Sequence, residues 1–261
     1  MAESLEGLAS VLARRTLAER LLSVMDQKHH PAYPHLTRPG LSRDQLLVHF
    51  RHEYLVYVRD FPVLLARTLG VVPPLQDVRK SLAENLYEEQ TGGLSGSAAH
   101  PELFLVMMEG LGFDRKSFDD DDAFLAPEAR EYRDFLRAKS VDAPWQAAVA
   151  LLTIFVEGSV NERAELAGTF LRASGEDAVK NHPLVVHYGC PPGAMKLTRA
   201  HGQVEGGHRG DAWRMVLAHT PDDGNVARAV VDVCQEGLAR WYRYRDAVAR
   251  RMGIPSSERA A

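Results

Sequence analysis

The chain has 261 residues, of which 45% are apolar and 25% charged, the proportions of an ordinary globular protein. Its net charge of −4 gives no electrostatic signature of a protein that binds nucleic acid. No apolar run approaches the roughly 20 residues that cross a bilayer, and the first residues lack the basic-then-apolar order of a signal peptide. The two cysteines, Cys190 and Cys234, lie far apart and are expected to be free thiols, so we predict a cytoplasmic protein.

Apolar residues recur every three or four positions along most of the chain, which predicts helices and no strands. Ser42 is expected to cap the second helix. Pro62 should bend that helix without ending it, because the apolar pattern continues to Leu69. The predicted helices, in chain order, cover residues 4–26, 42–69, 73–90, 100–112, 127–139, 143–163, 194–219 and 225–252.

Seven or eight helices joined by short connections predict an all-α bundle. The sequence contains no repeat or linker, so we expect a single domain over residues 1–261, with a core at about 41–252 and a loose tail at 253–261. The glycine-rich run 91–97 and residues 181–192 are expected to be irregular. Bundles of this kind build metal sites from side chains that project inward from facing helices.

The sequence HGQVEGGH contains a group of candidate metal ligands, His201, Glu205 and His208. Their steps of four and three residues place them on one helix face, where a carboxylate between two imidazoles can chelate an ion without distorting the helix. Three glycines in the same stretch weaken the helix and indicate close helix contact or a local bulge. The alternative is a polar face turned to water, and this segment alone does not decide between the two.

Glu157 is a second candidate, because it follows the strongly apolar segment 147–156 and lies on the same helical stripe as Thr153. A carboxylate on a stripe that faces the core must be paired, protonated or bound to a cation. The alternative is a glutamate at a helix end that faces solvent, since Gly158 and Ser159 follow at once.

Glu88 and Glu89 lie near the end of one predicted helix, and His100 begins the next. Alone, such a pair of glutamates is more often on the surface. Together, the three segments offer two glutamates on separate helices, a third carboxylate and three histidines, which is enough for two ions of the first transition row. Mixed carboxylate and imidazole ligands suit iron or manganese, and the lack of thiolates argues against structural zinc.

The segments NLYEEQ (85–90), HPELF (100–104) and the later H-x3-E-x2-H resemble the haem-oxygenase-like dimetal oxidases and oxygenases, iron-containing redox enzymes of a helical superfamily that includes TenA and pyrroloquinoline-quinone synthase. The resemblance covers about residues 44–217 and implies a haem-oxygenase-like bundle that holds two iron ions, with manganese or a mixed pair left open. The ligands that it implies are Glu88, His100, Glu157, His201, Glu205 and His208.

Two features depart from the family pattern. Glu205 stands where members commonly have aspartate. The insert between Glu88 and His100 is long and rich in glycine, so the choice between Glu88 and Glu89 is uncertain by one residue, a rotation of about 100° on a helix.

The resemblance implies a non-haem di-iron oxidoreductase with O2 as co-substrate. It implies a small-molecule substrate such as an amino acid or small carboxylate, with C–H abstraction leading to C–C cleavage, or with N-oxygenation. No catalytic residue is expected beyond the metal ligands, and no organic cofactor. His49, Glu53 and Tyr57 form a polar stripe that could line the substrate pocket, although pairing of His49 with Glu53 is equally consistent with their spacing. The substrate, the electron donor and a homodimer are left open.

Two other functions compete. Residues 29–46 and 143–146 resemble pyrroloquinoline-quinone synthase, a metal-free oxidase on the same bundle, in which case His29, His30 and His35 would line an organic substrate pocket. The non-enzymatic alternative is a helical interaction protein whose polar residues all face solvent, because fold alone does not determine function.

Overall fold

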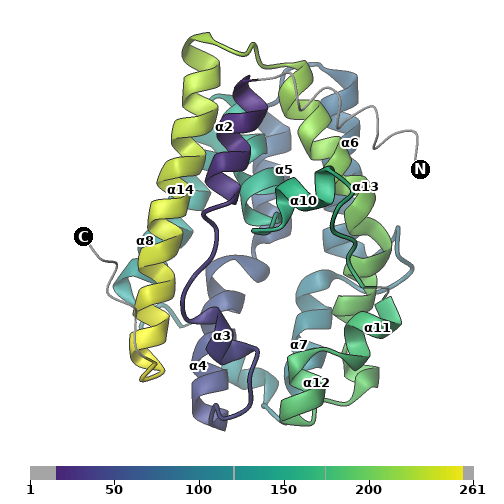
Figure 1. Ribbon diagram of the computed structural model, residues 1–261, viewed down its shortest axis with the longest axis vertical. Helices are drawn as coiled ribbons and strands as arrows, with labels where there is room; N and C mark the ends of the chain where they lie inside the picture. The colour runs from purple at the N-terminus through teal and green to yellow at the C-terminus, as the bar shows by residue number, and fades with distance from the viewer. Residues whose placement is uncertain (1–15, 120, 174, 255–261) are drawn as a thin grey trace.

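The computed structural model describes residues 16–119, 121–173 and 175–254, without the side chains of Tyr33 and residues 203–209. Within these ranges all regular structure is helical, which confirms the predicted all-α class (Figure 1). None of the helices described here is long and apolar enough to cross a membrane. The α-helices are α2 (Thr16–Met25), α3 (Tyr33–Leu36), α4 (Arg43–Glu53), α5 (Phe61–Val71), α6 (Gln76–Thr91), α7 (His100–Gly110), α8 (Pro127–Asp142), α9 (Trp145–Val149), α10 (Glu162–Leu166), α11 (Gly175–Lys180), α12 (Pro183–Tyr188), α13 (Lys196–Ala218) and α14 (Gly224–Arg251). The π-helices are η1 (Tyr54–Val58) and η3 (Ala150–Val156), and the 3-10 helices are η2 (Arg115–Phe118) and η4 (Pro192–Ala194).

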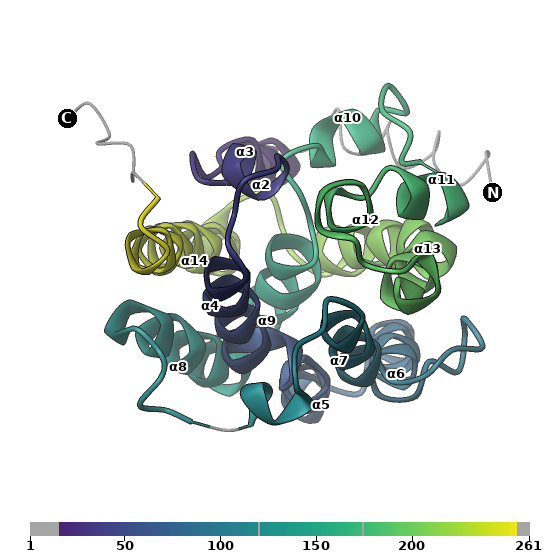
Figure 2. The same ribbon diagram turned by 90° about the horizontal axis from the view of Figure 1, so that it is seen from below.

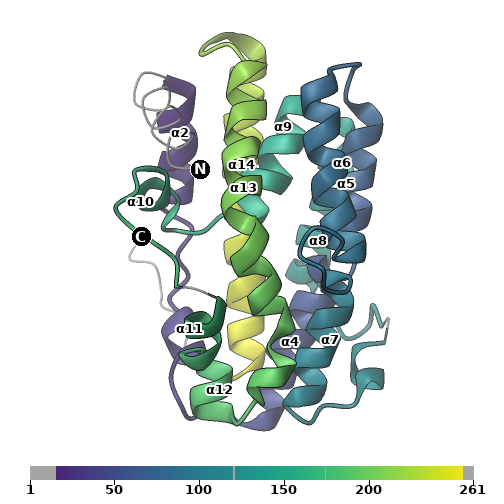
Figure 3. The ribbon, with the colours of Figure 1, turned by 90° about the vertical axis from the view of Figure 1, so that its right-hand side faces the viewer.

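The centre of the bundle is a continuous helix made of α9 and η3. Every residue from 147 to 155 is at most 3% exposed, as expected for a helix that is apolar on all sides. Both long C-terminal helices, α13 and α14, pack against it. Figure 2 shows most of the bundle end-on, with α14 at the left and α13 at the right, and in Figure 3 α13 lies in front of α14. On its other side α13 packs against α6 and α7, which also pack against each other.

The segment expected as one helix over 42–69 is instead three elements. Ser42 does cap it: its Oγ accepts from the Gln45 backbone at 3.2 Å, and the Gln45 side chain accepts from the Ser42 backbone at 2.8 Å. The α-helix gives way to η1, and α5 begins only at Phe61. The break precedes Pro62, which lies in the first turn of α5, where its missing N–H costs no hydrogen bond.

Two other boundaries differ from the prediction. The helix expected to reach residue 163 ends at Glu157, because Gly158 and Ser159 stop it, and α10 follows as a separate turn. The stretch 181–192, expected to be irregular, contains α12, which starts at Pro183. Its first turn is closed by the His182 ring, whose Nδ1 accepts from the Leu184 backbone at 3.2 Å. The predicted helix start at residue 4 and most of the predicted tail lie outside the described residues.

Candidate metal centre

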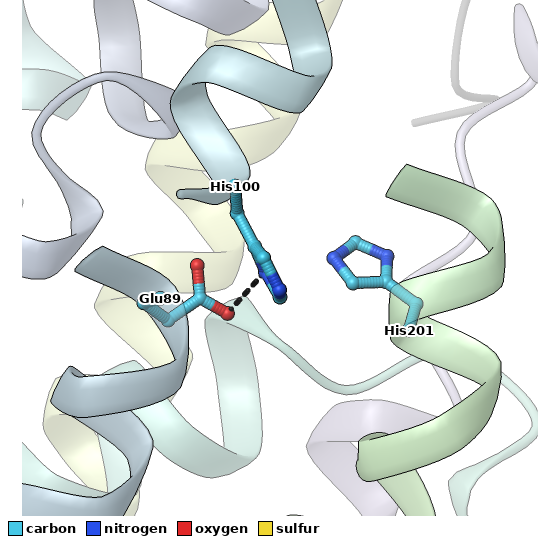
Figure 4. Close-up of side chains that lie close together, drawn as sticks. All are labelled: Glu89, His100 and His201. Atoms are coloured by element: carbon cyan, nitrogen blue, oxygen red, sulfur yellow. Dashed lines mark ion pairs between the residues drawn. The ribbon is translucent and has the colours of Figure 1, made fainter. Parts of the chain in front are cut away.

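Three side chains from three helices converge in the interior: Glu89 from α6, His100 from α7 and His201 from α13 (Figure 4). One ligand atom from each lies within 4.8 Å of the others. The rings of His100 and His201 are 4.9 Å apart, centroid to centroid, and inclined at 63°. The fold thus brings together Glu89 and His100, which are 11 residues apart in the sequence, and His201, which lies 101 residues after His100. The family resemblance implied that His100 and His201 would lie in one site.

His201 is held as a neutral imidazole. Burial lowers its pKa to about 3, and the positive charges of His100 and Arg172 act in the same direction. Neutral imidazole is the form that binds a metal ion, because it keeps a lone pair on nitrogen. The ring therefore enters this cluster ready to bind a cation.

His100 is buried, and each of its ring nitrogens faces a carboxylate. Nε2 lies 3.1 Å from Glu88 Oε1, and Nδ1 lies 2.9 Å from Glu89 Oε1. Burial lowers the pKa of His100, but contacts with Glu89 and Glu88 raise it by more, so that the net shift is upward. Nδ1 makes no hydrogen bond of acceptable geometry despite its burial. The buried nitrogen and the carboxylate oxygen lie close together without the alignment of a hydrogen bond. Two ligands of one metal ion have this arrangement.

The side chains of Glu88 and Glu89 make different contacts. Glu88 is 0% exposed, and its carboxylate accepts from the backbone of Leu94 and Ser95, from the Ser95 hydroxyl and from His100. Burial raises the pKa of Glu88, but these hydrogen bonds lower it below its usual value. Glu89, one residue on, faces His100 and His201 instead.

Glu157, at the C-terminus of η3, points back toward α6. Asn85 Nδ2 donates to its Oε1 at 2.8 Å. Asn85 is buried, and its Oδ1 is without a hydrogen bond. Asn85 and Glu89 are four residues apart on α6, so Glu157 is brought to the same face of that helix as the three-residue cluster. The side chain is partly buried and paired, as a core-facing carboxylate must be.

The side chains of Glu205 and His208 lie outside the described residues. The backbone of α13 is helical through both positions, so they follow His201 by about one and two turns of the same helix.

The donor set of the described cluster fits iron. It consists of carboxylate and imidazole groups, with a buried nitrogen that makes no hydrogen bond, and it contains no thiolate. The two cysteines are free and buried elsewhere. Burial raises the pKa of both thiols, to about 12 for Cys234, so neither is poised as a nucleophile.

The expected pocket residues His49, Glu53 and Tyr57 do come together, with one partner that the sequence did not predict. Arg245, 192 residues from Glu53, donates to Glu53 Oε1 at 2.6 Å and to the Tyr57 hydroxyl at 3.1 Å. The Tyr57 hydroxyl donates to the same oxygen at 3.0 Å, and His49 Nε2 lies 3.6 Å from Glu53 Oε2. Burial raises the pKa of Glu53, but the charges of Arg245 and His49 lower it to about 2.

A small cavity of about 20 Å³ lies against this group, lined by His30, His49, Arg245 and apolar residues of the C-terminal end of α14. His30 is buried there, with Nε2 2.9 Å from Asp246. His29 and His35 are exposed, so only one of the three loop histidines faces this cavity.

Two more polar contacts were not predicted, one made by the half-buried Lys28 and one by the buried Glu162. Lys28 donates to the carbonyls of Phe155, Val156 and Gly158 at 2.5, 3.0 and 2.7 Å, at the end of η3. Glu162, 2% exposed, accepts from Trp213 Nε1 at 2.9 Å. Neither pairing could be predicted from the sequence, because each joins segments that are tens of residues or more apart. A single polar residue in a helix does not indicate which distant residue it contacts.

In fold, the chain is similar to the solved structure of a TenA homologue from Pseudomonas syringae pv. tomato DC3000, with a TM-score of 0.66 and 15% sequence identity over 90% of this chain and 93% of that chain. At that identity the likeness defines the class of fold, a TenA-like helical bundle. No curated protein sequence matches the chain. Residues 48–242, well over half of the chain, match the family described as iron-containing redox enzyme. The chain therefore belongs to the iron-containing redox enzyme family, and the expected haem-oxygenase-like superfamily is confirmed.

Proposed function

We propose that the chain is a non-haem iron oxidoreductase that uses O2 to oxidise a small molecule. The observation that carries the proposal is the convergence of Glu89, His100 and His201 from three helices, within a family described as iron-containing. Glu157, Glu205 and His208 complete the proposed ligand set, which would suffice for two ions. Of the adjacent glutamates we place Glu89 in this set, because its carboxylate faces both histidines.

Iron bound by these residues would supply the electron-transfer chemistry with O2, and the protein would supply binding and orientation. The neutral ring of His201 holds a lone pair for the ion without first losing a proton. The buried helix α9–η3 keeps bulk water from the cluster on one side, which strengthens electrostatic interactions within it.

The substrate that we propose is an amino acid or a small carboxylate. The group formed by His49, Glu53, Tyr57 and Arg245 offers a cation and an anion side by side in a buried setting. Arg245 could bind the carboxylate of an amino acid and Glu53 its ammonium group, in place of their contact with each other. No buried charge would then be left unpaired.

The test is an anaerobic Fe(II) titration of metal-free protein, followed by an O2 pulse with absorbance and O2 consumption recorded. We expect two ions per chain and O2 uptake, with both strongly reduced in His201→Ala. The control is His187→Ala, an exposed histidine of α12, which should behave as the parent. No stoichiometric binding, with or without candidate amino acids, would contradict the proposal and favour a metal-free oxidase that uses the His30 and His49 cavity.

A further inference from the structure

Glu88 has no free acceptor site. An ionised carboxylate offers about four lone-pair positions. In Glu88, Oε2 accepts from the backbone of Leu94 at 2.7 Å and of Ser95 at 3.0 Å, and Oε1 accepts from the Ser95 hydroxyl at 2.5 Å and faces His100 Nε2 at 3.1 Å. A metal ion could bind this carboxylate only if one of these contacts were lost.

The contact with His100 determines which ring nitrogen is available. As a metal ligand His100 would be a neutral imidazole with one N–H, and a carboxylate beside Nε2 stabilises the tautomer with the proton on that nitrogen. Nδ1 is then left with its lone pair, on the side of the ring that faces Glu89. A carboxylate behind a ligating histidine typically fixes both the tautomer and the ring orientation in metal sites.

We propose that Glu88 is a positioning residue for His100, and that its neighbour Glu89 is the glutamate that binds metal. This inference rests on the proposed function and goes beyond it, because it divides the two adjacent glutamates between orienting a ligand and being one. One residue of helix, a rotation of about 100°, separates the two directions.

The insert after α6 supplies the rest of the support for Glu88. The backbone turns at Gly92, with φ of +65°, and Ser97 N–H donates back to the Gly92 carbonyl at 2.9 Å. This turn brings the N–H groups of Leu94 and Ser95 over the Glu88 carboxylate. The long glycine-rich connection therefore builds the anion-binding loop that holds Glu88 against His100.

A buried carboxylate under a loop could also serve only to stabilise that loop. The test must therefore distinguish an effect of Glu88 on the loop from an effect on the His100 ring. Three variants do so: Glu88→Gln removes the charge behind His100, Glu89→Gln removes the proposed ligand, and Ser97→Ala removes a hydroxyl of the same loop that contacts Ser95 and Ala98 but neither Glu88 nor His100. Anaerobic Co(II) titration by calorimetry gives the affinity and stoichiometry of each. The ring 15N shifts of His100 in Zn(II)-loaded protein report its tautomer.

We expect Glu88→Gln to bind Co(II) 10- to 100-fold more weakly at unchanged stoichiometry, with loss of the single Nε2–H tautomer. Glu89→Gln should bind fewer ions per chain, and Ser97→Ala should stay within about threefold of the parent, since Ser97 contacts neither a proposed ligand nor Glu88 through its side chain. If circular dichroism shows that Glu88→Gln does not fold, Glu88→Asp, which keeps the charge but withdraws it from the ring, should show the same weakening.

Three results would overturn the inference while the parent still binds Co(II). They are an unchanged affinity and tautomer in Glu88→Gln, a loss of stoichiometry in Glu88→Gln but not in Glu89→Gln, and a weakening in Ser97→Ala equal to that in Glu88→Gln. A parent protein that binds no Co(II) or Fe(II) would instead overturn the proposed function, and this inference with it.

Discussion

His52 shows how a single buried side chain links this fold to pH. Its Nδ1 lies 2.7 Å from the Val48 carbonyl, to which it donates, and its Nε2 accepts from the Ala126 backbone at 3.2 Å. The contact with Ala126 requires the neutral ring, because a protonated Nε2 has no lone pair to accept with. Burial lowers the pKa of His52 to about 4, from 6.5 in an exposed histidine, and the hydrogen bond to Val48 only partly opposes the shift.

The depressed pKa of His52 predicts acid destabilisation between pH 6.5 and 4. As pH falls below 6.5, His52 becomes protonated in the unfolded chain but stays neutral in the folded chain. The free energy of unfolding therefore decreases until about pH 4. At pH 5 the loss is about 2 kcal/mol from this histidine, at about 1.4 kcal/mol per pH unit. Urea unfolding at pH 7 and pH 5 measures it. His52→Gln should be less stable at pH 7, and its free energy of unfolding should depend less on pH. If that dependence were the same in the variant as in the parent, His52 would not be the cause of the acid destabilisation.

Individual residue types of the site were predictable, but their pairings were not. His201 was indicated by its spacing from Glu205 and His208, whereas His100 was indicated only by the family resemblance. It left Glu88 and Glu89 unresolved, since helix phase is uncertain after an insert of this length. It missed Arg245, because only the fold brings α14 against Glu53 from 192 residues away.

At the scale of elements, long periodic helices were predicted well and interruptions were not. The expected helices at 194–219 and 225–252 correspond to α13 and α14 within two residues at each end. The π-helices η1 and η3 have no sequence signature, because they arise where packing on both sides of a helix holds one extra residue in place. The short helix α12 depends on the capping contact of His182 rather than on a repeated pattern.

Lys28 caps the helix that ends at Glu157, and its removal should loosen that end. Its ammonium group donates to the carbonyls of Phe155 and Val156 in the last turn and of Gly158 just beyond it, and lies 4.9 Å from the centre of the Phe155 ring. We expect Lys28→Met to lower the free energy of unfolding by about 1.5–3 kcal/mol, the range for hydrogen bonds to a charged group. Thermal unfolding measures it. Lys80→Met, in an exposed pair with Glu84, is the control and should change stability by less than about 0.5 kcal/mol.

The loop that holds Glu88 offers a matched pair of glycines. Gly92 and Gly96 both have φ near +66°, but a Cβ at Gly92 would lie 2.5 Å from the Ala98 carbonyl oxygen, whereas a Cβ at Gly96 would meet nothing within 4 Å. Gly96→Ala should therefore cost only the left-handed penalty of about 1–2 kcal/mol. Gly92→Ala should cost more and should also weaken metal binding. Equal losses of stability in the two variants, by chemical unfolding, would show that the predicted clash is relieved.

For the whole molecule, metal binding should act as a cross-link between distant parts of the chain. The proposed ligands come from α6, α7 and α13 and from the end of η3, which span residues 76 to 218. An ion that binds only the folded state adds about 2.7 kcal/mol of stability when its concentration is 100 times its Kd. We expect Fe(II) under anaerobic conditions to raise the unfolding temperature of the parent and to leave His201→Ala nearly unchanged. A similar rise in both proteins would indicate binding elsewhere.

The π-helix η3 has a consequence for how relatives of this chain should be aligned. The Glu157 N–H donates to the Leu152 carbonyl, five residues back, so the helix carries one residue more than α-helical winding would place before Glu157. A relative whose central helix lacks that extra residue should align with a one-residue gap inside the range 150–156. An alignment that moves the gap into the following loop will set Val156 or Gly158 opposite the other chain's glutamate. The equivalent of Glu157 would then look absent in a protein that retains it.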